Sequence, residues 1–408
     1  MFCVRNRVLR LLICVTVWIL LLTACTDGNR QKEPAAAVPG GQTLQQLHLN
    51  ESGGAARIVG VWVPYFICDK LFSSGEADTA RETVRQYLSE MQNFGVNTVF
   101  LHVCAFGEST YPSANYPMTP TAHGIDEIAV FQEICGELDL SLHLWINPLR
   151  LQTREYMEAQ RGDAVLTQWY RDSALKAANL SEWEGRYYLN PAAKTTRDFL
   201  TDVLRELIER YRPDGIHIDD YFYPTDAPAF DAEEFRRSGE ADLAQWRREN
   251  ITALVRQMYA AAHEDAGERV FSISPQGNLL MNYDTLFADV EEWSRAGDCC
   301  DLLIPQIYFG YLNEMCPFAE TAEEWISMPR AEHVGLAVGL AAYKVGAEDP
   351  FAGDGQDEWI RYPGILARQA GEMLREPALC GICFYHSDSL AELSAQERDA
   401  VIRSVLEQ

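Results

Sequence analysis

The sequence predicts a (β/α)8 barrel with enlarged loops. Three observations carry this prediction: eight short apolar runs of extended character, a segment of helical period between successive runs, and the alternation of the two over about 350 residues. A doubly wound open sheet is the main alternative, but no Gly-rich phosphate loop follows the first run. We therefore expect one large barrel domain.

The eight predicted strands are short and largely apolar, as strands of a buried parallel sheet are. They are residues 58–66, 97–106, 141–147, 215–220, 270–276, 302–308, 334–342 and 381–386. The predicted helices are residues 83–94, 128–138, 197–211, 242–263, 285–295, 322–328, 362–374 and 394–406. In the first of these helices Val84, Tyr87, Leu88 and Met91 fall on one face, which indicates a helix that packs on the barrel.

The N-terminal segment has the layout of an export signal. Three arginines precede an apolar run at residues 11–22, which is too short to span a bilayer. The run ends in Leu-Thr-Ala-Cys, which resembles the bacterial lipobox, and Cys25 is the predicted lipidation site. An ordinary signal or a membrane anchor that ends in cysteine is the alternative. We expect a signal peptide at 1–24, a lipid-anchored tether at 25–56 and the barrel domain at 57–408, exported to the outer face of a bacterial membrane.

The charge of the chain argues against a nucleic-acid ligand, and its aromatic content is compatible with a sugar ligand. The chain has 34 Lys and Arg against 60 Asp and Glu, a net charge of -26, which would repel a phosphate backbone and argues against a nucleic-acid partner. Aromatic residues make up 11% of the chain, including nine Trp. They provide ample material for platforms on which sugars stack, although core packing uses the same residues.

The eleven cysteines invite a metal or disulfide interpretation. Cys380 and Cys383 have the spacing of half a zinc site, but no second pair exists, and strand residues three apart face opposite sides. We expect structural free thiols, no metal and no cofactor. One or two disulfides are the alternative.

In a barrel the active site lies at the carboxyl ends of the strands. Alternation along residues 215–220 turns Ile216 and Ile218 toward the helices and His217 and Asp219 toward the barrel axis. On three other strands the same parity sends inward His143, Trp145, Asn147, Ser272, Ser274, Gln276, Gln306 and Tyr308. A purely structural barrel would fill these layers with Val, Ile and Leu, so the pattern predicts a site, with a hydrogen-bonded polar plug as the alternative.

The same segments carry a family resemblance. The run Asp-Gly-Ile-His-Ile-Asp-Asp-Tyr-Phe-Tyr-Pro at residues 214–224 resembles the signature of the bacterial glycosyl-hydrolase-like family 10, which includes divisome-associated lipoproteins acting on peptidoglycan glycan strands. Segments that end at Arg150, Pro191, Asn278, Tyr308 and Lys344 resemble other motifs of that family. The resemblance covers residues 57 to 390 approximately and implies a barrel, glycoside hydrolysis and a polysaccharide substrate.

The sequence departs from related patterns at two places. The family tends to have Arg-Pro-x-Gly-Asp after the second strand, whereas residues 104–108 read Cys-Ala-Phe-Gly-Glu. The spacing Gly-x-His-x-Asp that ends at Asp219 also resembles the fourth strand of α-amylase-like barrels, whose final Asp is the nucleophile. Those enzymes place a Glu at the end of the fifth strand, where this chain has Gln276.

Glycosidic cleavage passes through a cationic transition state and usually needs one ionised and one protonated carboxyl group. Asp219 is the predicted ionised group, because a polar mouth with His217 beneath it would favour the charged form. Glu108 is the leading general-acid candidate because it follows a strand end, and Asp220, of opposite parity, is a candidate whose alternative role is to anchor the loop. The predicted substrate-binding residues are His217, His143, Trp145, Asn147, Arg150, Tyr221, Tyr223, Gln276, Asn278, Gln306, Tyr308, Tyr343 and Lys344.

The predicted function is a surface-anchored glycoside hydrolase that cleaves peptidoglycan glycan strands or a related cell-wall polysaccharide. The alternative is a catalytically silent glycan-binding lipoprotein that uses the same groove. A metal-dependent barrel hydrolase would need a cluster of His and carboxylates, and no His-x-His pair ends the first strand. The predicted partners are the polysaccharide and, through Cys25, a membrane.

Overall fold

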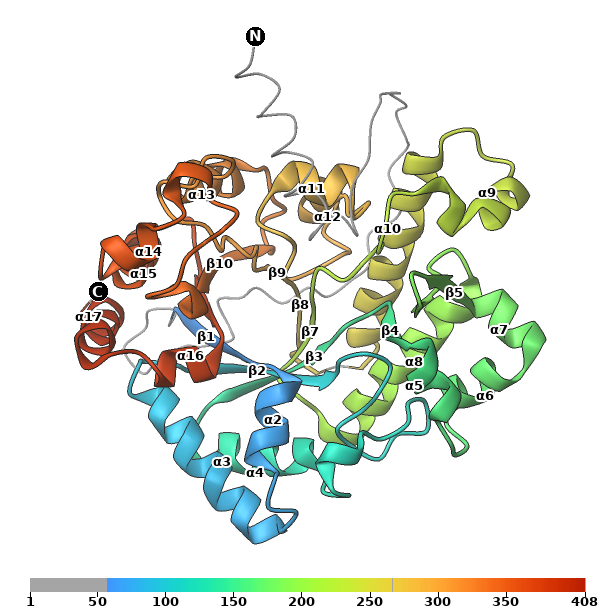
Figure 1. Cartoon of the computed structure of the whole chain (residues 1–408), viewed down its shortest axis with the longest axis horizontal. Coiled ribbons are helices and arrows are strands. Elements are labelled where there is room, and N and C mark those ends of the chain that lie inside the picture. Colours follow the sequence, from blue (N-terminus) through green and yellow to red (C-terminus); the bar gives the residue numbers. More distant parts are fainter. Residues whose placement is uncertain (1–56, 266, 408) are drawn as a thin grey trace.

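The computed structural model describes residues 57–265 and 267–407, so the predicted signal peptide and the whole predicted tether, Cys25 included, lie outside the described residues. Eight parallel strands close into a barrel in the order β1-β11-β10-β9-β8-β7-β3-β2, which confirms the predicted fold class (Figure 1). The barrel strands are β1 (Ile58–Val63), β2 (Thr98–Cys104), β3 (Ser141–Ile146), β7 (Gly215–Ile218), β8 (Val270–Ile273), β9 (Leu302–Leu303), β10 (Gly335–Ala341) and β11 (Gly381–Tyr385). Each lies within one of the eight predicted runs.

Side chains alternate between the barrel interior and the shell that faces the helices. On β7, Ile216 and Ile218 belong to the large hydrophobic shell, whereas His217 lies inside the barrel, as the alternation predicts. A Cβ at Gly215 would lie 2.2 Å from the His143 ring, so a glycine is needed there to leave room for the histidine. The apolar side chains of the interior are Ile58, Trp62, Phe100, Trp145, Val270, Leu302, Ile304, Ala337 and Cys383.

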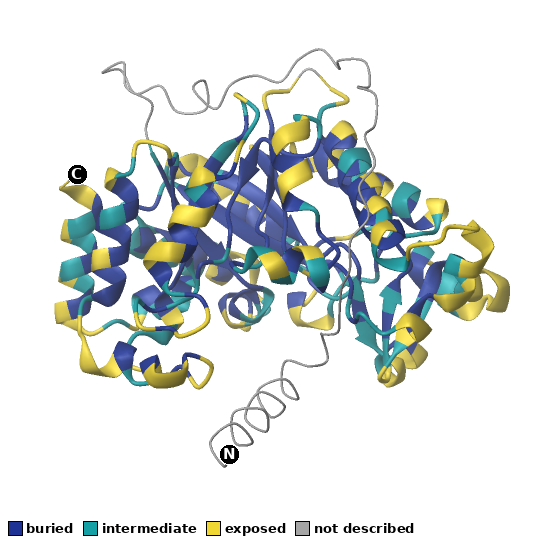
Figure 2. Cartoon of the chain, turned by 90° about the horizontal axis from the view of Figure 1, so that it is seen from above, coloured by how far each residue is buried: buried dark blue, intermediate teal, exposed yellow. Residues whose placement is uncertain are grey.

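Helices surround the barrel and expose their outer faces, while the strands are buried (Figure 2). The longer helices are α3 (Ala77–Gln92), α4 (Glu127–Glu137), α8 (Lys194–Tyr211), α10 (Leu243–Ala262), α13 (Phe318–Ser327), α15 (Ile365–Arg375) and α17 (Ala395–Leu406). The shorter ones are α2 (Tyr65–Leu71), α5 (Arg154–Ala159), α6 (Val165–Arg171), α7 (Ser173–Asn179), α9 (Ala232–Ser238), α11 (Leu279–Asp284), α12 (Val290–Ala296), α14 (Glu358–Arg361) and α16 (Ser387–Ala391). None of the helices within the described ranges is long and apolar enough to cross a membrane.

The helix predicted at residues 285–295 begins later than predicted, at Val290. Residues 285–289 are a turn between α11 and α12, and Asp289 caps α12 by accepting a hydrogen bond from the Glu292 amide at 3.1 Å. A side-chain acceptor at this position satisfies one of the free amides of the first helical turn. Asp242 caps α10 in the same way, on the Gln245 amide at 3.0 Å.

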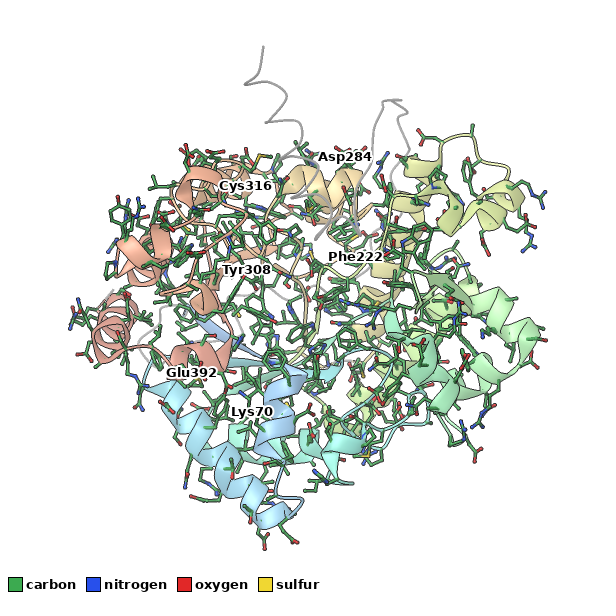
Figure 3. All side chains as sticks on the ribbon, viewed as in Figure 1. Lys70, Phe222, Asp284, Tyr308, Cys316 and Glu392 are labelled. Atoms are coloured by element: carbon green, nitrogen blue, oxygen red, sulfur yellow. The ribbon has the colours of Figure 1, made fainter. Side chains whose placement is uncertain are left out.

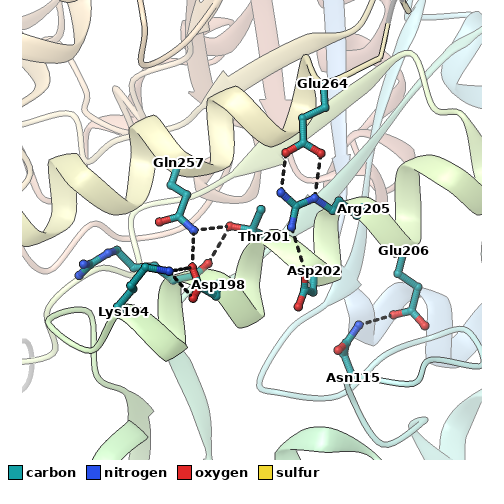
Figure 4. A network of polar contacts seen from close by, with 10 residues as sticks. Asn115, Lys194, Asp198, Thr201, Asp202, Arg205, Glu206, Gln257 and Glu264 are labelled. Atoms are coloured by element: carbon teal, nitrogen blue, oxygen red, sulfur yellow. Dashed lines mark hydrogen bonds and ion pairs between the residues drawn. The ribbon is translucent and has the colours of Figure 1, made fainter.

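Polar contacts hold neighbouring outer helices together (Figure 4). Arg205 of α8 reaches Glu264 just after α10, with 2.8 Å from Nε to Oε2, and Gln257 of α10 donates to Asp198 of α8 at 2.9 Å. On the other side of α8, Glu206 accepts a hydrogen bond from the Asn115 side chain at 3.0 Å. The exposed Arg205–Glu264 pair contributes little, about 1 kcal/mol at most, so its main effect is to fix orientation.

A small antiparallel sheet, which was not predicted from the sequence, is inserted between β3 and α8. Its strands are β4 (Arg150–Thr153), β5 (Leu180–Trp183) and β6 (Arg186–Leu189), in the order β4-β6-β5. One face buries Leu151, Leu180, Tyr187 and Leu189 in the hydrophobic core. The opposite face is therefore free to line a cavity above the barrel.

Candidate functional site

A cavity of about 410 Å³ opens at the carboxyl ends of the barrel strands, where a barrel places its active site. Strand ends and the loops after them provide the floor, and the inserted sheet provides one wall. Figure 3 labels two lining residues, Tyr308 and Phe222, whose side chains lie within the ring of outer helices. The residues that line this cavity include Trp62, His102, Phe106, Trp145, Asn147, Arg150, Trp183, Glu184, Arg186, Tyr188, Asp219, Asp220, Tyr221, Gln276, Gln306, Tyr308, Tyr343 and Tyr385.

His217 lies beneath the cavity in a closed hydrogen-bond chain. The Trp62 indole donates to His217 Nε2 at 3.0 Å, and His217 Nδ1 lies 2.8 Å from Ser272 Oγ. Because an indole nitrogen only donates, Nε2 is the acceptor and Nδ1 carries the hydrogen. Burial holds the pKa of His217 well below its usual range, and the nearby His143 and His102 lower it further. His217 is therefore a neutral structural group. It was predicted to bind substrate, but it is not among the residues that line the cavity.

Asp219 follows β7 and lies in the cavity, only 2% exposed. The Trp145 indole donates to its Oδ2 at 3.1 Å, and the Tyr221 amide donates to its Oδ1 at 3.2 Å. Burial nevertheless holds its pKa well above the usual range, and the charge of Asp220 raises it further. The expectation that His217 would favour an ionised Asp219 is therefore wrong, because His217 is neutral and burial dominates.

Asp220 lies in the same cavity, although strand parity predicted that it would point away. The reason is that β7 ends at Ile218, so alternation no longer applies at residue 220. Burial raises the pKa of Asp220 to about 6, while a hydrogen bond with Gln306 lowers it. Two neighbouring carboxyl groups resist losing both protons, so we expect the pair to hold one proton near neutral pH. Such a pair can offer both an acid and an anion.

Glu108 is not among the residues that line the cavity. Its carboxyl group accepts hydrogen bonds from Gln152 at 3.0 Å and from the Tyr156 hydroxyl, both on or next to β4. Burial raises its pKa to about 7, a value suited to a general acid at neutral pH. The structure thus gives Glu108 a suitable pKa but does not bring it together with the two aspartates.

Trp145 positions Asp219 instead of offering an open platform. The His102 ring stacks on Trp145 with centroids 3.7 Å apart and an interplanar angle of 11°, which covers one face of the indole. His102 Nε2 in turn lies 3.1 Å from Asn147 Oδ1, so the amide oxygen accepts and His102 donates. Burial lowers the pKa of His102 to about 3, and the ring is neutral. This chain fixes Trp145 and, through it, the Asp219 carboxyl group.

Tyrosine rings form the side of the cavity near β9, β10 and β11. Tyr308 and Tyr385 stack with centroids 5.6 Å apart, and Tyr343 meets both edge-on. Lys344 donates to the Tyr308 carbonyl at 2.7 Å and pairs with Asp349 at 2.6 Å. Lys344 therefore holds the backbone at Tyr308 in place. It was predicted to bind substrate, but it does not line the cavity.

The predicted site residues divide into two groups. Those that line the cavity are Asp219, Asp220, Trp145, Asn147, Arg150, Tyr221, Tyr223, Gln276, Gln306, Tyr308 and Tyr343. Those that do not are Glu108, His217, Lys344, His143 and Asn278. His143 is buried against Phe100 with ring centroids 4.8 Å apart, and Asn278 caps α11 on the Met281 amide.

Four lining residues on or next to the inserted sheet were missed: Trp183, Glu184, Arg186 and Tyr188. A signal for them exists in the sequence. Glu184 and Gly185 both have positive φ, 49° and 78°, and they join β5 to β6 as a two-residue hairpin turn. A turn of this kind favours Gly at its second position, so Glu-Gly between two aromatic runs is a hairpin signal.

The described ranges contain eight cysteines and no cluster that could hold a metal ion. No group of three or more His, Cys, Asp or Glu side chains there is placed to hold a metal ion. The eight cysteines of these ranges are free. Cys380 precedes β11 by one residue, so the strand alternation that was expected to separate it from Cys383 does not govern its direction.

The chain is similar in sequence to known glycosyl hydrolases. The family model for glycosyl hydrolase-like 10 matches residues 57–358. The glycosyl hydrolase DigH of Escherichia coli K12 is 24% identical over 438 residues, covering 98% of each chain. The glycosyl hydrolase YngK of Bacillus subtilis is 26% identical over 319 residues, covering 69% of this chain and 60% of that protein.

Solved structures give the same fold. The glycoside hydrolase domain of PgaB (BpsB) from Bordetella bronchiseptica superposes with a TM-score of 0.51 at 13% identity, covering 86% of this chain and 99% of that one. At this identity the likeness concerns the fold alone. The family match spans well over half of the residues, and the chain therefore belongs to the glycosyl hydrolase-like 10 family and is a glycoside hydrolase.

Proposed function

We propose that this glycoside hydrolase cleaves the glycan strands of peptidoglycan or a related cell-wall polysaccharide, at the outer face of a bacterial membrane to which Cys25 anchors it. The observation that carries the proposal is the carboxyl pair of Asp219 and Asp220 in a cavity walled by aromatic rings. The lipobox-like sequence at Cys25 supports a wall substrate, because an exported enzyme held at a membrane meets the wall.

The proposed chemistry uses the shared proton of the pair. The protonated carboxyl group donates to the glycosidic oxygen as the bond breaks, and the ionised one faces the positive charge that develops on the sugar. Water then adds to the sugar carbon, and its proton returns to the carboxylate that acted as the acid. Trp145 and the Tyr221 amide hold Asp219 in place for this task. Gln276, which follows β8 in the cavity, carries no carboxyl group, so the proposed pair comes from the end of β7 alone.

Glu108 is a second candidate for the acid, because its pKa of about 7 fits the role. To act, its side chain would have to leave Gln152 and Tyr156 and turn past the cavity wall. Hydrogen bonds at active sites often rearrange when substrate binds, so this candidate is tested together with the pair.

The experiment is reducing-end release from glycan strands freed of their peptides, with α-glucans as the comparison substrate and full-length protein purified in detergent. We expect release from the wall strands and little or none from α-glucans. Binding of the strands without any release would support the alternative of a silent glycan-binding protein. Release from α-glucans alone would overturn the proposed substrate class.

A further inference from the structure

The cavity wall formed by the inserted sheet carries two positive charges. Arg150 of β4 lies opposite Tyr188 of β6, and Trp183 of β5 lies opposite Arg186 of β6. Residues two apart on a strand share a face, so these four side chains lie on one face of the sheet. All four line the cavity.

Aromatic rings hold both guanidinium groups. The Arg150 Cζ lies 5.0 Å from the centroid of Phe106 and 4.7 Å from that of Tyr221, and the Arg186 Cζ lies 5.5 Å from the centroid of Phe106. Arg186 also donates from Nη1 to the Leu151 carbonyl at 2.7 Å. Stacking fixes a guanidinium plane and leaves much of its N–H edge available for a ligand.

Neither arginine forms an ion pair with a carboxylate among the residues that the structure describes, although the charge of Arg150 lowers the pKa of both Asp219 and Asp220. By contrast Arg154, the first residue of α5 directly after β4, pairs with Glu182. The Nε of Arg150 is buried without a hydrogen-bond partner. Burial lowers the pKa of Arg186, and the charge of Arg150 lowers it further. A bound anion would satisfy the free donor and relieve the repulsion between the two groups.

We propose that Arg150 and Arg186 form a subsite for a carboxylate carried by a sugar of the substrate, so that the enzyme selects acidic glycans. This inference rests on the proposed function. A guanidinium group binds a carboxylate through two parallel N–H···O bonds, and Trp183 and Tyr188 on the same face offer rings for the sugar itself. The chain as a whole carries a charge of -26 and repels acidic polymers, so these two groups confine the attraction to the cavity.

Calorimetric titration tests the subsite with four oligosaccharides. The first is a tetrasaccharide of alternating N-acetylglucosamine and N-acetylmuramic acid with free lactyl carboxylates. The second is the same chain with those carboxylates converted to methylamides. A hyaluronan hexasaccharide presents uronic carboxylates, and chitohexaose carries none. The proteins are wild type, Arg150→Gln, Arg186→Gln, the double variant and, as a matched control, Arg154→Gln at the start of α5 beside the sheet.

We expect wild type to bind the free tetrasaccharide at least about 10-fold more tightly than its methylamide, since charge-assisted bidentate bonds are strong. Each single variant should reduce this preference and the double variant should abolish it, while Arg154→Gln retains it. Preferential binding of hyaluronan over chitohexaose would assign the subsite to uronic acids, and preference for the muramic chain alone would assign it to lactyl groups. Equal affinity of wild type for carboxylate and methylamide would overturn the proposal, as would an unchanged preference in the double variant.

Two further measurements distinguish an incorrect subsite proposal from a variant that does not fold and from an incorrect proposed function. Melting temperatures report folding, and if the double Gln variant unfolds, Arg150→Lys with Arg186→Lys keeps the charge and should retain part of the preference. Reducing-end release is followed in parallel. Carboxylate-dependent binding without release would refute the proposed function and leave the subsite standing. Release that is indifferent to carboxylate blocking would refute the subsite and leave the function standing.

Discussion

Replacing Asp219 by Asn tests the carboxyl pair most directly. The change keeps the size of the side chain but removes the carboxyl group with the higher pKa, which holds the proton that the pair shares. General acid catalysis by a positioned group contributes about 10²- to 10⁴-fold, roughly 3 to 5 kcal/mol, so turnover should fall at least about 100-fold. The measurement is kcat and KM for reducing-end release from glycan strands.

The fold should survive this substitution because two effects oppose each other. Both partners of Asp219, the Trp145 indole and the Tyr221 amide, are donors, and an Asn side chain has one oxygen, so one bond is lost at a cost of about 1 to 3 kcal/mol. The folded pKa of Asp219 is raised, so its contribution to stability is present below the unfolded pKa and is lost as pH rises through the folded pKa. Removing the group restores free energy at neutral pH, and the melting temperature should change little.

The matched control is Asp202→Asn, which removes an exposed carboxylate that pairs with Arg205 outside the cavity. Turnover of this variant should equal that of wild type. Near-wild-type turnover of Asp219→Asn, on a substrate that the parent cleaves, would refute the assignment. A loss of activity accompanied by a collapse of the melting temperature would mean that Asp219 acts on the fold and not on the reaction.

Four other predictions follow from the carboxyl groups and the anchor. Asp220, with a pKa of about 6, should set the acid limb of the kcat/KM profile, because protonation removes the anion as pH falls through 6. The Asp220→Asn variant should have a lower plateau and a flatter acid limb. Glu108→Gln should reduce activity less than Asp219→Asn does, because Glu108 does not line the cavity. If the two variants lost equal activity, and an alkaline limb near pH 7 in the wild-type kcat/KM profile disappeared in Glu108→Gln, Glu108 would be the acid. Glu127 is fully buried, and among the residues that the structure describes its carboxyl group has only the weak Cys68 thiol beside it as a hydrogen-bonding group. Burial raises its pKa to about 8, so its contribution to stability is lost as pH rises through 8. In urea unfolding, Glu127→Gln should therefore be more stable than wild type by a few kcal/mol (on the order of 3) above pH 8 and about equal to it near pH 4. Detergent partitioning should move Cys25→Ala from the detergent phase to the aqueous phase, and equal partitioning of variant and wild type would contradict lipidation at that residue.

The barrel could be predicted because its elements carry strong periodic signals. Every predicted strand run contains an observed barrel strand, and the inward parity of His217 and Ser272 is the one that the structure has. The alternation of buried faces is imposed by the pleat, so it can be read from sequence wherever the strand continues. The alternation no longer predicts the direction of a side chain beyond the end of a strand. Asp220 lies beyond the end of β7, and extending the alternation to it wrongly predicted that it points away from the cavity.

The inserted sheet could not be found by the same reasoning. Its strands have four residues each, too few to establish a period, and the helices between them span six or seven residues. What stabilises the sheet is the burial of Leu151, Tyr187 and Leu189 against the rest of the domain, which is a tertiary effect. The ionisation of the aspartates was missed for a related reason, since burial depth is set by packing and not by the neighbours in sequence.

The division between barrel and insertion bears on how the cavity achieves selectivity. The aspartates, His217 and Trp62 belong to barrel strands or follow them directly, and their hydrogen bonds run between strands. Arg150 and Arg186 lie on the inserted sheet, and Gln152 of the sheet together with Tyr156 of the adjoining α5 holds Glu108. Loops at the carboxyl face of a barrel vary without disturbing its core. A change in this sheet should therefore alter which glycan binds, and the ionisation of Glu108 with it, while the carboxyl pair at the end of β7 remains in place.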